Sequence, residues 1–477
     1  MKITTADLII DRHASIKKTL SKIKKNGEGV CFICEDDKKL IGILTQGDIR
    51  NIILKGVSIN TSINKYINKK FFSLPVSIDN AEAQKLLKIG RKIIPLINNK
   101  KQFVDYISYN KSKNIPLVRP DLNGNEIEYV IKCIKSSYVS SVGKYLDIFE
   151  KKFKNYYKAN SALSVSSCTA GLQLILSYLN LKKNDEVIVP NVTFVSPINA
   201  IIHSGGKPVF CDIDKKNWTI DCDDLKKKIT KKTKAIICVH TYGHPCDMSK
   251  ILKLIKGKKI SLIEDCAEAI GTKYRGSNIG TFGRFSVFSF YGNKTITTGE
   301  GGMIIFKNKN DFIKCKVLRN HGMNTNKKYW HDVIGFNYRM TNLQAAIGVA
   351  QFEKIKFFIN NKINIAKQYK KNLKNIKKII LPFEEKWAKH SYWLYNVLIK
   401  NISKSTRDKI IRELNNAGIE SRPMFYPASD MKIYKKYVNK NSKFSNISYL
   451  GISLPSFVGL KKEQINLICK KLKELVE

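Results

Sequence analysis

Between about residues 160 and 310, short apolar runs rich in β-branched and aromatic residues alternate with stretches of helical periodicity. Strands separated by crossover helices imply a mostly parallel sheet with helices on its faces. Ligands of such sheets bind at the carboxyl ends of the strands. The sequence therefore predicts an α/β fold, with strands at 162–166, 186–190, 208–212, 235–240, 261–265, 284–290 and 303–306.

Changes in this pattern divide the chain into three predicted domains. Residues 113–355 form the large domain with the sheet. A long helical region at 351–373, short strands such as 392–399 and a closing helix at 462–476 predict a smaller α+β domain over 356–477. The first 112 residues have a character of their own, and the polar stretch 110–114 is the predicted linker.

Within residues 1–112, strands at 29–34 and 40–44 alternate with amphipathic helical stretches around 14–25 and 79–89. The run G-I-L-T-Q-G-D-I-R, residues 42–50, places Thr45 and Asp48 where a strand ends and a helix begins. A hydroxyl and free amides there suit a phosphate, and a carboxylate can hold ribose hydroxyls. The stretch resembles a CBS-domain pair, which implies an adenine nucleotide as ligand. The second repeat has fitting strands but lacks a T-x-x-D, and the alternative is that Thr45 and Asp48 only cap a helix.

The net charge of the chain is +46. Such an excess of positive charge is typical of nucleic-acid-binding proteins. The lysines are nevertheless spread through every segment without a basic stripe, so we interpret them as a solvated coat that attracts anionic small molecules, and we expect no nucleic-acid partner.

The cysteine pattern and the hydropathy argue against a metal site and a membrane anchor. Eleven cysteines at irregular spacings form no disulfide framework. The one C-x-x-C, Cys31 to Cys34, lies in a predicted strand without a second pair at zinc spacing, so no metal is expected. No signal peptide or membrane span is recognisable, and a cytoplasmic enzyme is the expectation.

Two ionisable residues follow buried strands of the predicted sheet. Asp265 ends the strand 261–265, and Lys294 comes 29 residues later, between an apolar strand and a glycine-rich turn. Desolvation lowers the pKa of a lysine and frees its amine for Schiff-base chemistry. The alternative is a surface lysine in a loop.

A third group precedes these two in the chain. The sequence S-V-S-S-C-T-A-G, residues 164–171, predicts a strand, a tight turn and an apolar helix. Amides and hydroxyls at that helix N-terminus, near Cys168 and Thr169, can bind a phosphate, although an ordinary helix cap has the same composition. An amine, a carboxylate and a phosphate cradle are the three groups that pyridoxal 5′-phosphate requires.

Four long motifs carry a family resemblance over residues 115–477. They are V-H-T-Y-G-H-P-C-D-M (239–248), E-D-C-A-E-A-I-G (264–271), F-S-F-Y-G-N-K-T-I-T-T-G-E-G-G-M (288–303) and Y-W-H-D-V-I-G-F-N-Y-R-M-T-N-L-Q-A-A-I-G (329–348). This part resembles the DegT/DnrJ/EryC1/StrS nucleotide-sugar aminotransferases. The resemblance implies an aspartate-aminotransferase-like fold of type I, pyridoxal 5′-phosphate as cofactor, and a homodimer or dimer of dimers.

The resemblance also implies residue roles. Lys294 would bind the cofactor covalently and move protons, and Asp265 would bind the pyridine nitrogen. Glu268 would lie over the cofactor, where relatives often have His or Gln. Further contacts implied are Cys168, Thr169 and Ser289 to the phosphate, Asn337 to the phosphate from the partner subunit, Phe194 beside the ring, and, more weakly, His321 and Arg339 on the substrate side. Two residues depart from the family pattern: Cys168 replaces a glycine, where a side chain would crowd the turn if the position needs φ > 0, and Gly171 stands where alanine is commoner.

The expected reaction moves an amino group from L-glutamate to a nucleotide-linked 4-keto-6-deoxysugar, for surface polysaccharide synthesis. Two of the motifs resemble a branch of the family that uses GDP-4-keto-6-deoxymannose. Tyr329, Trp330 and His331 offer flat and hydrogen-bonding surfaces for that substrate, or else they pack at a dimer interface. A UDP- or dTDP-linked sugar, and a nucleotide-sensing regulator without enzymatic activity, remain the alternatives.

Overall fold

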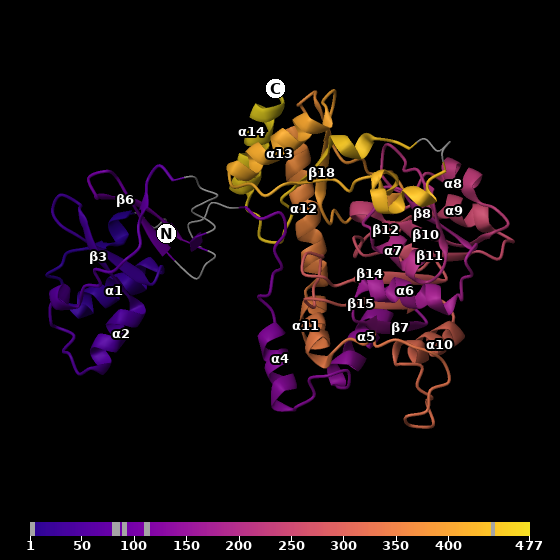
Figure 1. Ribbon diagram of the computed structural model, residues 1–477, viewed down its shortest axis with the longest axis horizontal. Helices are drawn as coiled ribbons and strands as arrows, with labels where there is room; N and C mark the ends of the chain where they lie inside the picture. The colour runs from indigo at the N-terminus through magenta and orange to yellow at the C-terminus, as the bar shows by residue number, and fades with distance from the viewer. Residues whose placement is uncertain (1–4, 79–85, 88–92, 109–114, 440–443) are drawn as a thin grey trace. The chain divides into compact units, whose positions relative to one another are not determined.

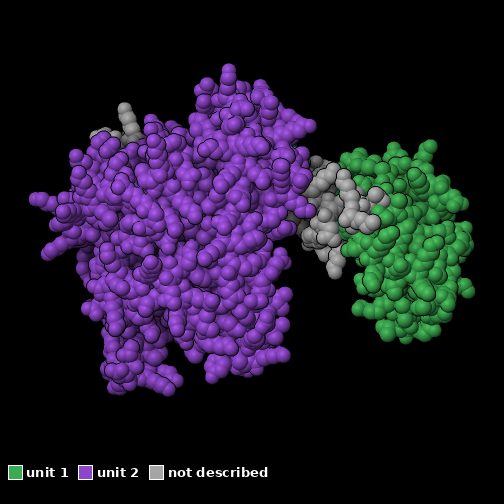
Figure 2. Space-filling view, turned by 180° about the vertical axis from the view of Figure 1, so that it is seen from behind, with its two compact units in different colours: residues 1–114, 416–418 green, residues 115–415, 419–477 purple. Residues whose placement is uncertain are grey.

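The computed structural model describes residues 5–78, 86–87, 93–108, 115–439 and 444–477. The chain forms two compact units (Figure 2). The first comprises Met1–Asn114 with Asn416–Gly418, and the second comprises Ile115–Asn415 with Ile419–Glu477. Within the described residues, none of the helices combines the length and apolarity that crossing a membrane requires.

The N-terminal unit contains two three-stranded sheets, β1-β2-β3 and β4-β5-β6. The predicted strands and the first predicted helix are confirmed, whereas most of the predicted helix 79–89 lies outside the described residues. The C-x-x-C cysteines lie in β2, where they are buried and free of a disulfide. The elements are β1 (Ile9–Ile10), α1 (Ile16–Asn26), β2 (Val30–Cys34), β3 (Leu40–Thr45), α2 (Gln46–Leu54), β4 (Leu74–Pro75), β5 (Ile93–Ile97) and β6 (Phe103–Ser108).

A seven-stranded sheet, in the order β7-β15-β14-β11-β10-β8-β9, is the centre of the second unit (Figure 1). Its strands are β7 (Ser161–Val165), β8 (Glu186–Pro190), β9 (Lys207–Cys211), β10 (Thr233–Val239), β11 (Ser261–Asp265), β14 (Phe285–Ser289) and β15 (Gly302–Phe306). Neighbours pair in parallel except that β15 runs antiparallel to both β14 and β7. The prediction of a mostly parallel sheet is confirmed, and each strand begins and ends within two residues of its predicted range.

Both faces of this sheet are buried, which is why its strands are nearly continuous apolar runs. Successive side chains of a strand point to opposite faces. Accordingly Leu262 belongs to a core that also contains residues of α5 and α11, and Ile263 belongs to the core of α6 and α7. The helices of the sheet layers are α5 (Lys144–Tyr157), α6 (Cys168–Tyr178), α7 (Ser196–His203), α8 (Cys222–Lys228), α9 (Met248–Ile255) and α10 (Lys309–Arg319).

The predicted helix 351–373 is corrected to two helices, α11 (Asn342–Glu353) and α12 (Ile355–Leu373), which follow one another in Figure 1. A capping box of Thr341 and Gln344 starts α11 nine residues before the predicted start. Because α11 is buried on most sides, its sequence lacks the amphipathic period that would have revealed it. A further helix, α4 (Glu126–Lys135), packs on α11.

The C-terminal part of this unit is an α+β layer with a four-stranded sheet, β16-β18-β20-β19. The strand predicted at 392–399 starts only at Tyr395, since Tyr392 has a left-handed backbone with φ of 52°. The elements are β16 (Ile379–Ile380), β18 (Tyr395–Ile399), α13 (Lys404–Asn416), β19 (Arg422–Pro423), β20 (Gly451–Leu454) and α14 (Lys462–Val476), and β12 (Lys273–Tyr274), β13 (Ser277–Asn278) and β17 (Ala388–Lys389) form a small sheet apart.

A buried lysine connects α12 with this layer. The side chain of Lys362 is only 3% exposed and donates to the backbone carbonyls of Trp393, at 3.0 Å, and Ser456. Burial lowers the pKa of Lys362 from 10.5 to about 7. The ammonium is disfavoured inside the protein, so the folded chain gives up this proton more readily than the unfolded chain.

This shift predicts a pH dependence of stability. Between pH about 7 and about 10 the unfolded chain binds more protons at Lys362 than the folded chain does, so the contribution of Lys362 to the free energy of unfolding rises with pH. We expect the unfolding free energy of the wild type, relative to that of Lys362→Met, to rise by about 1 kcal/mol per pH unit in this range. Urea denaturation of both proteins measures it. If the unfolding free energies of the two proteins changed with pH in the same way, the lowered pKa of Lys362 would be contradicted.

Candidate active site

The carboxyl ends of the central strands surround a cavity of about 550 Å³ in the second unit. Seven residues that the sequence analysis singled out line it: Cys168, Thr169, Phe194, Asp265, Glu268, Ser289 and Lys294. They come from the start of α6, the loop after β8, and the ends of β11 and β14. The cavity thus lies at the edge of the sheet where a ligand was predicted.

Lys294 lies in the turn after β14 and points into the cavity region rather than into solvent, with a side chain that is 12% exposed. Its Nζ is 3.9 Å from Oε1 of Glu268 and 3.8 Å from the ring centroid of Trp393. The alternative of a lysine on an exposed loop is therefore wrong.

Two buried carboxyl groups share the cavity with this amine. Asp265 is the last residue of β11, and its Oδ1 accepts a hydrogen bond from the amide of Ala267 at 3.0 Å. Glu268 accepts a hydrogen bond from the amide of Tyr242 at 2.7 Å. Burial raises the pKa of Asp265 above its usual value and raises the pKa of Glu268 to about 7. The desolvated carboxyl of Glu268 is thereby suited to bind or release a proton at neutral pH.

The start of α6 forms the predicted cradle. Ser167 caps the helix by accepting from the amide of Ala170, and the hydroxyls of Thr169 and Ser196 are hydrogen-bonded at 2.6 Å. The first amides of a helix have no partner within it and favour an anion. A Cβ on Gly302 of β15 would lie 2.8 Å from the nitrogen of Cys168, so glycine is required where β15 passes the cradle.

The two departures from the family pattern have structural explanations. Cys168 is the first residue of α6 and is not among the residues of positive φ, so its side chain does not strain the turn. A Cβ on Gly171 would lie 2.8 Å from Cγ1 of Val287 in β14, which is closer than real contacts allow. Glycine at this position lets α6 pack closely on the sheet.

The chemical groups of these residues fit the binding of pyridoxal phosphate. A buried amine, a buried carboxyl at the end of β11 and a helix N-terminus with free amides surround one cavity. Lys294, Asp265 and the cradle of Cys168, Thr169 and Ser289 would hold the aldehyde, the ring nitrogen and the phosphate of the cofactor, respectively.

Sequence reasoning missed the aromatic wall of the cavity. The rings of Tyr242, Trp393 and Phe425 are stacked, with Tyr242 in the middle at interplanar angles of 10° to Trp393 and 12° to Phe425. Trp393 and Phe425 follow Tyr242 in the chain by more than 140 residues. No local pattern could have revealed the contact, because it depends on how the C-terminal layer packs against the end of β10.

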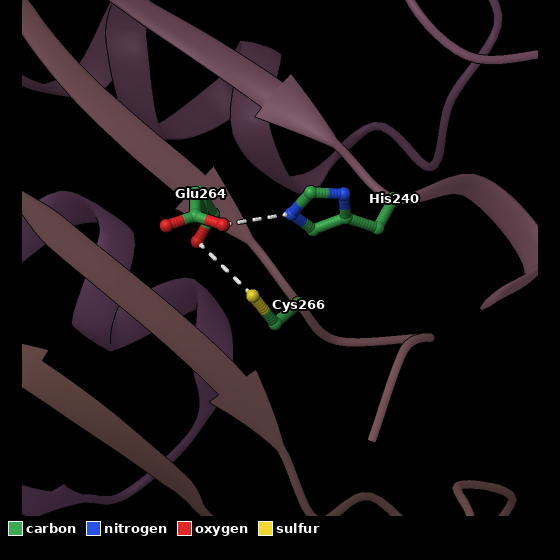
Figure 3. Close-up of side chains that lie close together, drawn as sticks. All are labelled: His240, Glu264 and Cys266. Carbon is green, nitrogen blue, oxygen red and sulfur yellow. Dashed lines mark hydrogen bonds and ion pairs between the residues drawn. The ribbon is translucent and has the colours of Figure 1, made fainter. Parts of the chain in front are cut away.

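Glu264, the buried residue directly before Asp265, lies at the centre of a hydrogen-bond network. Its carboxylate accepts from the amides of Gly280, Phe282 and Gly283 and from the hydroxyl of Ser286. His240 contributes a fifth bond of 3.1 Å (Figure 3). The other imidazole nitrogen, Nδ1, accepts from the amide of Cys246, so the ring donates to Glu264 through Nε2.

His240, Glu264 and Cys266 place one ligand atom each within 4.8 Å of one another, as a metal site would. The oxygens of Glu264 are already used by five donors, and Nδ1 of His240 by one. We therefore interpret this cluster as a structural support of the β11 end.

The substrate-side candidates and Asn337, the expected phosphate contact from the partner subunit, do not line the cavity. His321, Tyr329, Trp330, His331, Asn337 and Arg339 belong to an arm, residues 320–339, that is held together by bridges between Asn320 and Asn337 and between Met323 and His331. Arg339 donates to Asn337 at 2.9 Å. The side chain of Tyr329 is 88% exposed. Within one chain, the structure does not bring these residues to Lys294.

In the N-terminal unit, Thr45 and Asp48 form the capping box of α2. The hydroxyl of Thr45 donates to Oδ2 of Asp48 at 2.7 Å and accepts from the Asp48 amide at 3.1 Å. Within the described part of the chain, the hydrogen bonds of Thr45 and Asp48 are thus those of a helix cap, the alternative interpretation given above.

Comparisons with known proteins agree with this geometry. The DegT/DnrJ/EryC1/StrS aminotransferase family matches residues 120–473, and the CBS domain matches residues 2–55. Two relatives, each named GDP-perosamine synthase, come from Escherichia coli O157:H7 and Vibrio cholerae. Both are 44% identical to this chain, over 76% and 75% of it and over 98% of their own length. Among solved structures, the PLP form of a putative sugar aminotransferase, Spr1654 from Streptococcus pneumoniae, superposes with a TM-score of 0.72 at 27% sequence identity. The match covers 76% of this chain and 98% of the Spr1654 chain.

The Glu264 network predicts a large loss of stability on a nearly isosteric change. Glu264→Gln would turn an amide NH₂ toward backbone N–H donors that now bind a carboxylate, leaving buried donors unpaired. We expect a loss of about 3 kcal/mol in unfolding free energy, measured by chemical denaturation. The matched change Glu474→Gln, at an exposed ion pair with Lys471, should cost less than about 0.5 kcal/mol. Equal effects of the two changes would contradict the structural role.

Proposed function

Since the chain belongs to the DegT/DnrJ/EryC1/StrS family of PLP-dependent sugar aminotransferases, we propose that its cavity transfers the amino group of L-glutamate to the keto carbon of a nucleotide-linked 4-keto-6-deoxysugar. The observation that carries the proposal is the meeting of the Lys294 amine and the Asp265 carboxyl in one cavity, beside the start of α6.

Each residue has a distinct part in this proposal. Pyridoxal phosphate supplies an aldehyde for amino-group exchange and a ring that withdraws electrons. Lys294 binds the cofactor and moves a proton to and from the reacting carbon. Asp265 holds a proton at the pyridine nitrogen. Cys168, Thr169 and Ser289 bind the phosphate, and Phe194, which is 56% exposed at the cavity, lies beside the ring.

The aromatic wall excludes water from the reacting groups. Tyr242 and Trp393 are 2% and 4% exposed, and they close the cavity on the side of the C-terminal layer. Exclusion of water strengthens the electrostatic interactions of Lys294 and Asp265 and prevents loss of the reactive groups to hydrolysis.

We propose GDP-4-keto-6-deoxymannose as the sugar substrate and GDP-perosamine as the product. Support comes from the names of the two relatives, which this chain matches over nearly their whole length. The basic surface attracts a diphosphate, and Arg422, whose guanidinium pairs with Glu420 at 2.6 Å, is among the residues that line the cavity. A UDP- or dTDP-linked keto-sugar is the alternative substrate.

We further propose that the active form is a homodimer, or a dimer of dimers, with shared sites. Ile127, Ile131 and Ile134 follow at helical spacing on one face of α4, and their side chains are 72%, 44% and 59% exposed. Ile334 in the arm is 98% exposed. Apolar surface of this extent favours association, and a second copy would cover it. Asn337 of the partner subunit would then reach the phosphate.

For the N-terminal unit we propose an adenine nucleotide as ligand, with Asp48 and Thr45 at its site. The match of residues 2–55 to the CBS domain supports nucleotide binding by this unit. Thr45 and Asp48 lie at the start of α2, where a phosphate is favoured. Calorimetry of the full chain with AMP and ATP tests the proposal, and absence of heat with both would leave the unit a structural one.

A substrate panel tests the main proposal. With L-glutamate, the purified protein should aminate the GDP-linked 4-keto-6-deoxysugar faster than the UDP- and dTDP-linked ones, because a site that hydrogen-bonds guanine leaves buried groups unpaired with another base. Mass spectrometry of the sugar nucleotide measures the product. Lys294→Ala should form none. A faster reaction with the UDP sugar would refute the GDP assignment alone, and inactivity toward all three sugars would refute the aminotransferase.

Subunit mixing tests the shared site. Asn337→Ala and Lys294→Ala should each be poorly active, while their mixture should recover up to about a quarter of the wild-type activity. Half of the randomly mixed dimers are hybrids, and one of the two sites in each hybrid is intact. Activity is assayed after exchange has been verified by native mass spectrometry. A mixture no more active than its components would contradict a site that uses both subunits.

A further inference from the structure

The amine of Lys294 is held between an aromatic ring and a carboxyl group. Trp393 presents its ring 3.8 Å from Nζ, and Glu268 presents Oε1 at 3.9 Å from the same atom. Both residues are 4% exposed. An ammonium is attracted by the face of an indole, and more strongly when water is excluded. The two groups together therefore form a site for a lysine that is not bonded to the cofactor.

The backbone of Tyr242 fixes both sides of this site. Its amide donates to Oε2 of Glu268 at 2.7 Å, and its carbonyl accepts from the amide of Trp393 at 3.0 Å. Tyr242 has a φ of 54°, a left-handed conformation that costs energy in a residue with a side chain. The surrounding hydrogen bonds maintain this conformation, in which one peptide segment positions the ring and the carboxyl.

Two further contacts hold Trp393 in place. Its Nε1 donates to the carbonyl of Asn293, the residue before the lysine, at 2.8 Å. Its own carbonyl accepts from Lys362, the buried lysine of α12, at 3.0 Å. The ring is thus connected to the turn that carries Lys294 and to the core of the C-terminal layer. Such preorganisation is typical of groups that act during a reaction rather than of chance contacts.

We propose that Trp393 and Glu268 form a holding site for the amine of Lys294 during the part of each turnover in which the lysine is released from the cofactor. This inference rests on the proposed function, since release of the lysine is a feature of that chemistry. A free lysine side chain has many rotamers, and one that leaves the cavity cannot return a proton to the substrate carbon. Trp393 acts through Lys294 and is a positioning residue.

Chemical labelling of the full chain tests the site without relying on activity. The cofactor-free protein is treated with a small excess of an acetylating reagent, and peptide mapping gives the labelling rate of Lys294 relative to the exposed Lys227 of α8. Trp393→Leu should raise this relative rate by about 5-fold, the factor that loss of one cation–π contact implies. Trp393→Phe retains an aromatic face and should stay within about 2-fold of the wild type.

Two controls separate the holding site from general loosening of the fold. Trp387→Leu removes an indole that packs on Tyr274 and His244, away from the cavity lining, and should leave the labelling of Lys294 unchanged. Glu268→Gln keeps an acceptor for the Tyr242 amide while removing the charge, and it should also raise the labelling rate. The proposal is overturned if Trp393→Leu leaves the rate unchanged, or if Trp387→Leu raises it equally.

A second arm distinguishes this inference from the proposed function. The cofactor-loaded enzyme is incubated with L-glutamate alone, which releases the lysine if the enzyme is an aminotransferase, and labelling is repeated. Protection by Trp393 in both arms supports the proposal. Protection in the cofactor-free arm, with no response to glutamate, would refute the aminotransferase and leave the geometry of the site standing. Loss of protection only in the glutamate arm would refute the holding site.

Discussion

The carboxylate of Glu264 accepts five hydrogen bonds inside the protein and fixes the end of β11, the strand that carries Asp265 to the cavity. Three of the donors are amides of residues 280–283, and the fourth and fifth come from β14 and from the end of β10. One side chain thus joins three strand ends. Because neighbouring residues of a strand point to opposite faces, the anchoring of Glu264 on one face directs Asp265 to the other, toward α6 and the cavity. The acid that lines the cavity is thus positioned by the acid before it.

The C-terminal layer completes a site that the central sheet begins. The sheet supplies the amine, the carboxyls and the cradle, all at strand ends or helix starts, as is usual for α/β proteins. The stacked rings of Trp393 and Phe425 come from the other layer and contact Tyr242 at the end of β10. Lys362 holds the carbonyl of Trp393 although a buried lysine is disfavoured by desolvation. The hydrogen bond from Lys362 fixes the backbone of Trp393, and the indole of Trp393 in turn covers the amine of Lys294. A role in orienting this indole would explain why an unfavourably buried lysine is present at position 362.

The sequence was sufficient for the parts of the molecule whose signals are local. The seven central strands were recognisable because both faces are buried, and Lys294 and Asp265 because each follows a strand in an atypical setting. The start of α11 was missed since a helix that is apolar on most sides has no period to detect. Tyr242 and Trp393 were missed because their contact joins segments more than 100 residues apart, and Lys362 because its Nζ donates to backbone carbonyls, which no side-chain pattern reveals. The motif at 329–348 was recognised, but the position of residues 320–339 in an arm outside the cavity follows only from the fold.

The two carboxyls beside Lys294 differ in a way that suits different tasks. Asp265 ends a strand, and its Oδ1 is fixed by the amide of Ala267, so its geometry depends on the sheet. Glu268 lies three residues later, in the turn after β11, with its Oε1 3.9 Å from the amine, and burial brings its pKa to about 7. A group with such a pKa can hold or release a proton at neutral pH with little cost. In the proposed reaction Lys294 gives and takes one proton in every turnover, and Glu268 would be a neighbour able to share that proton while Asp265 binds the ring.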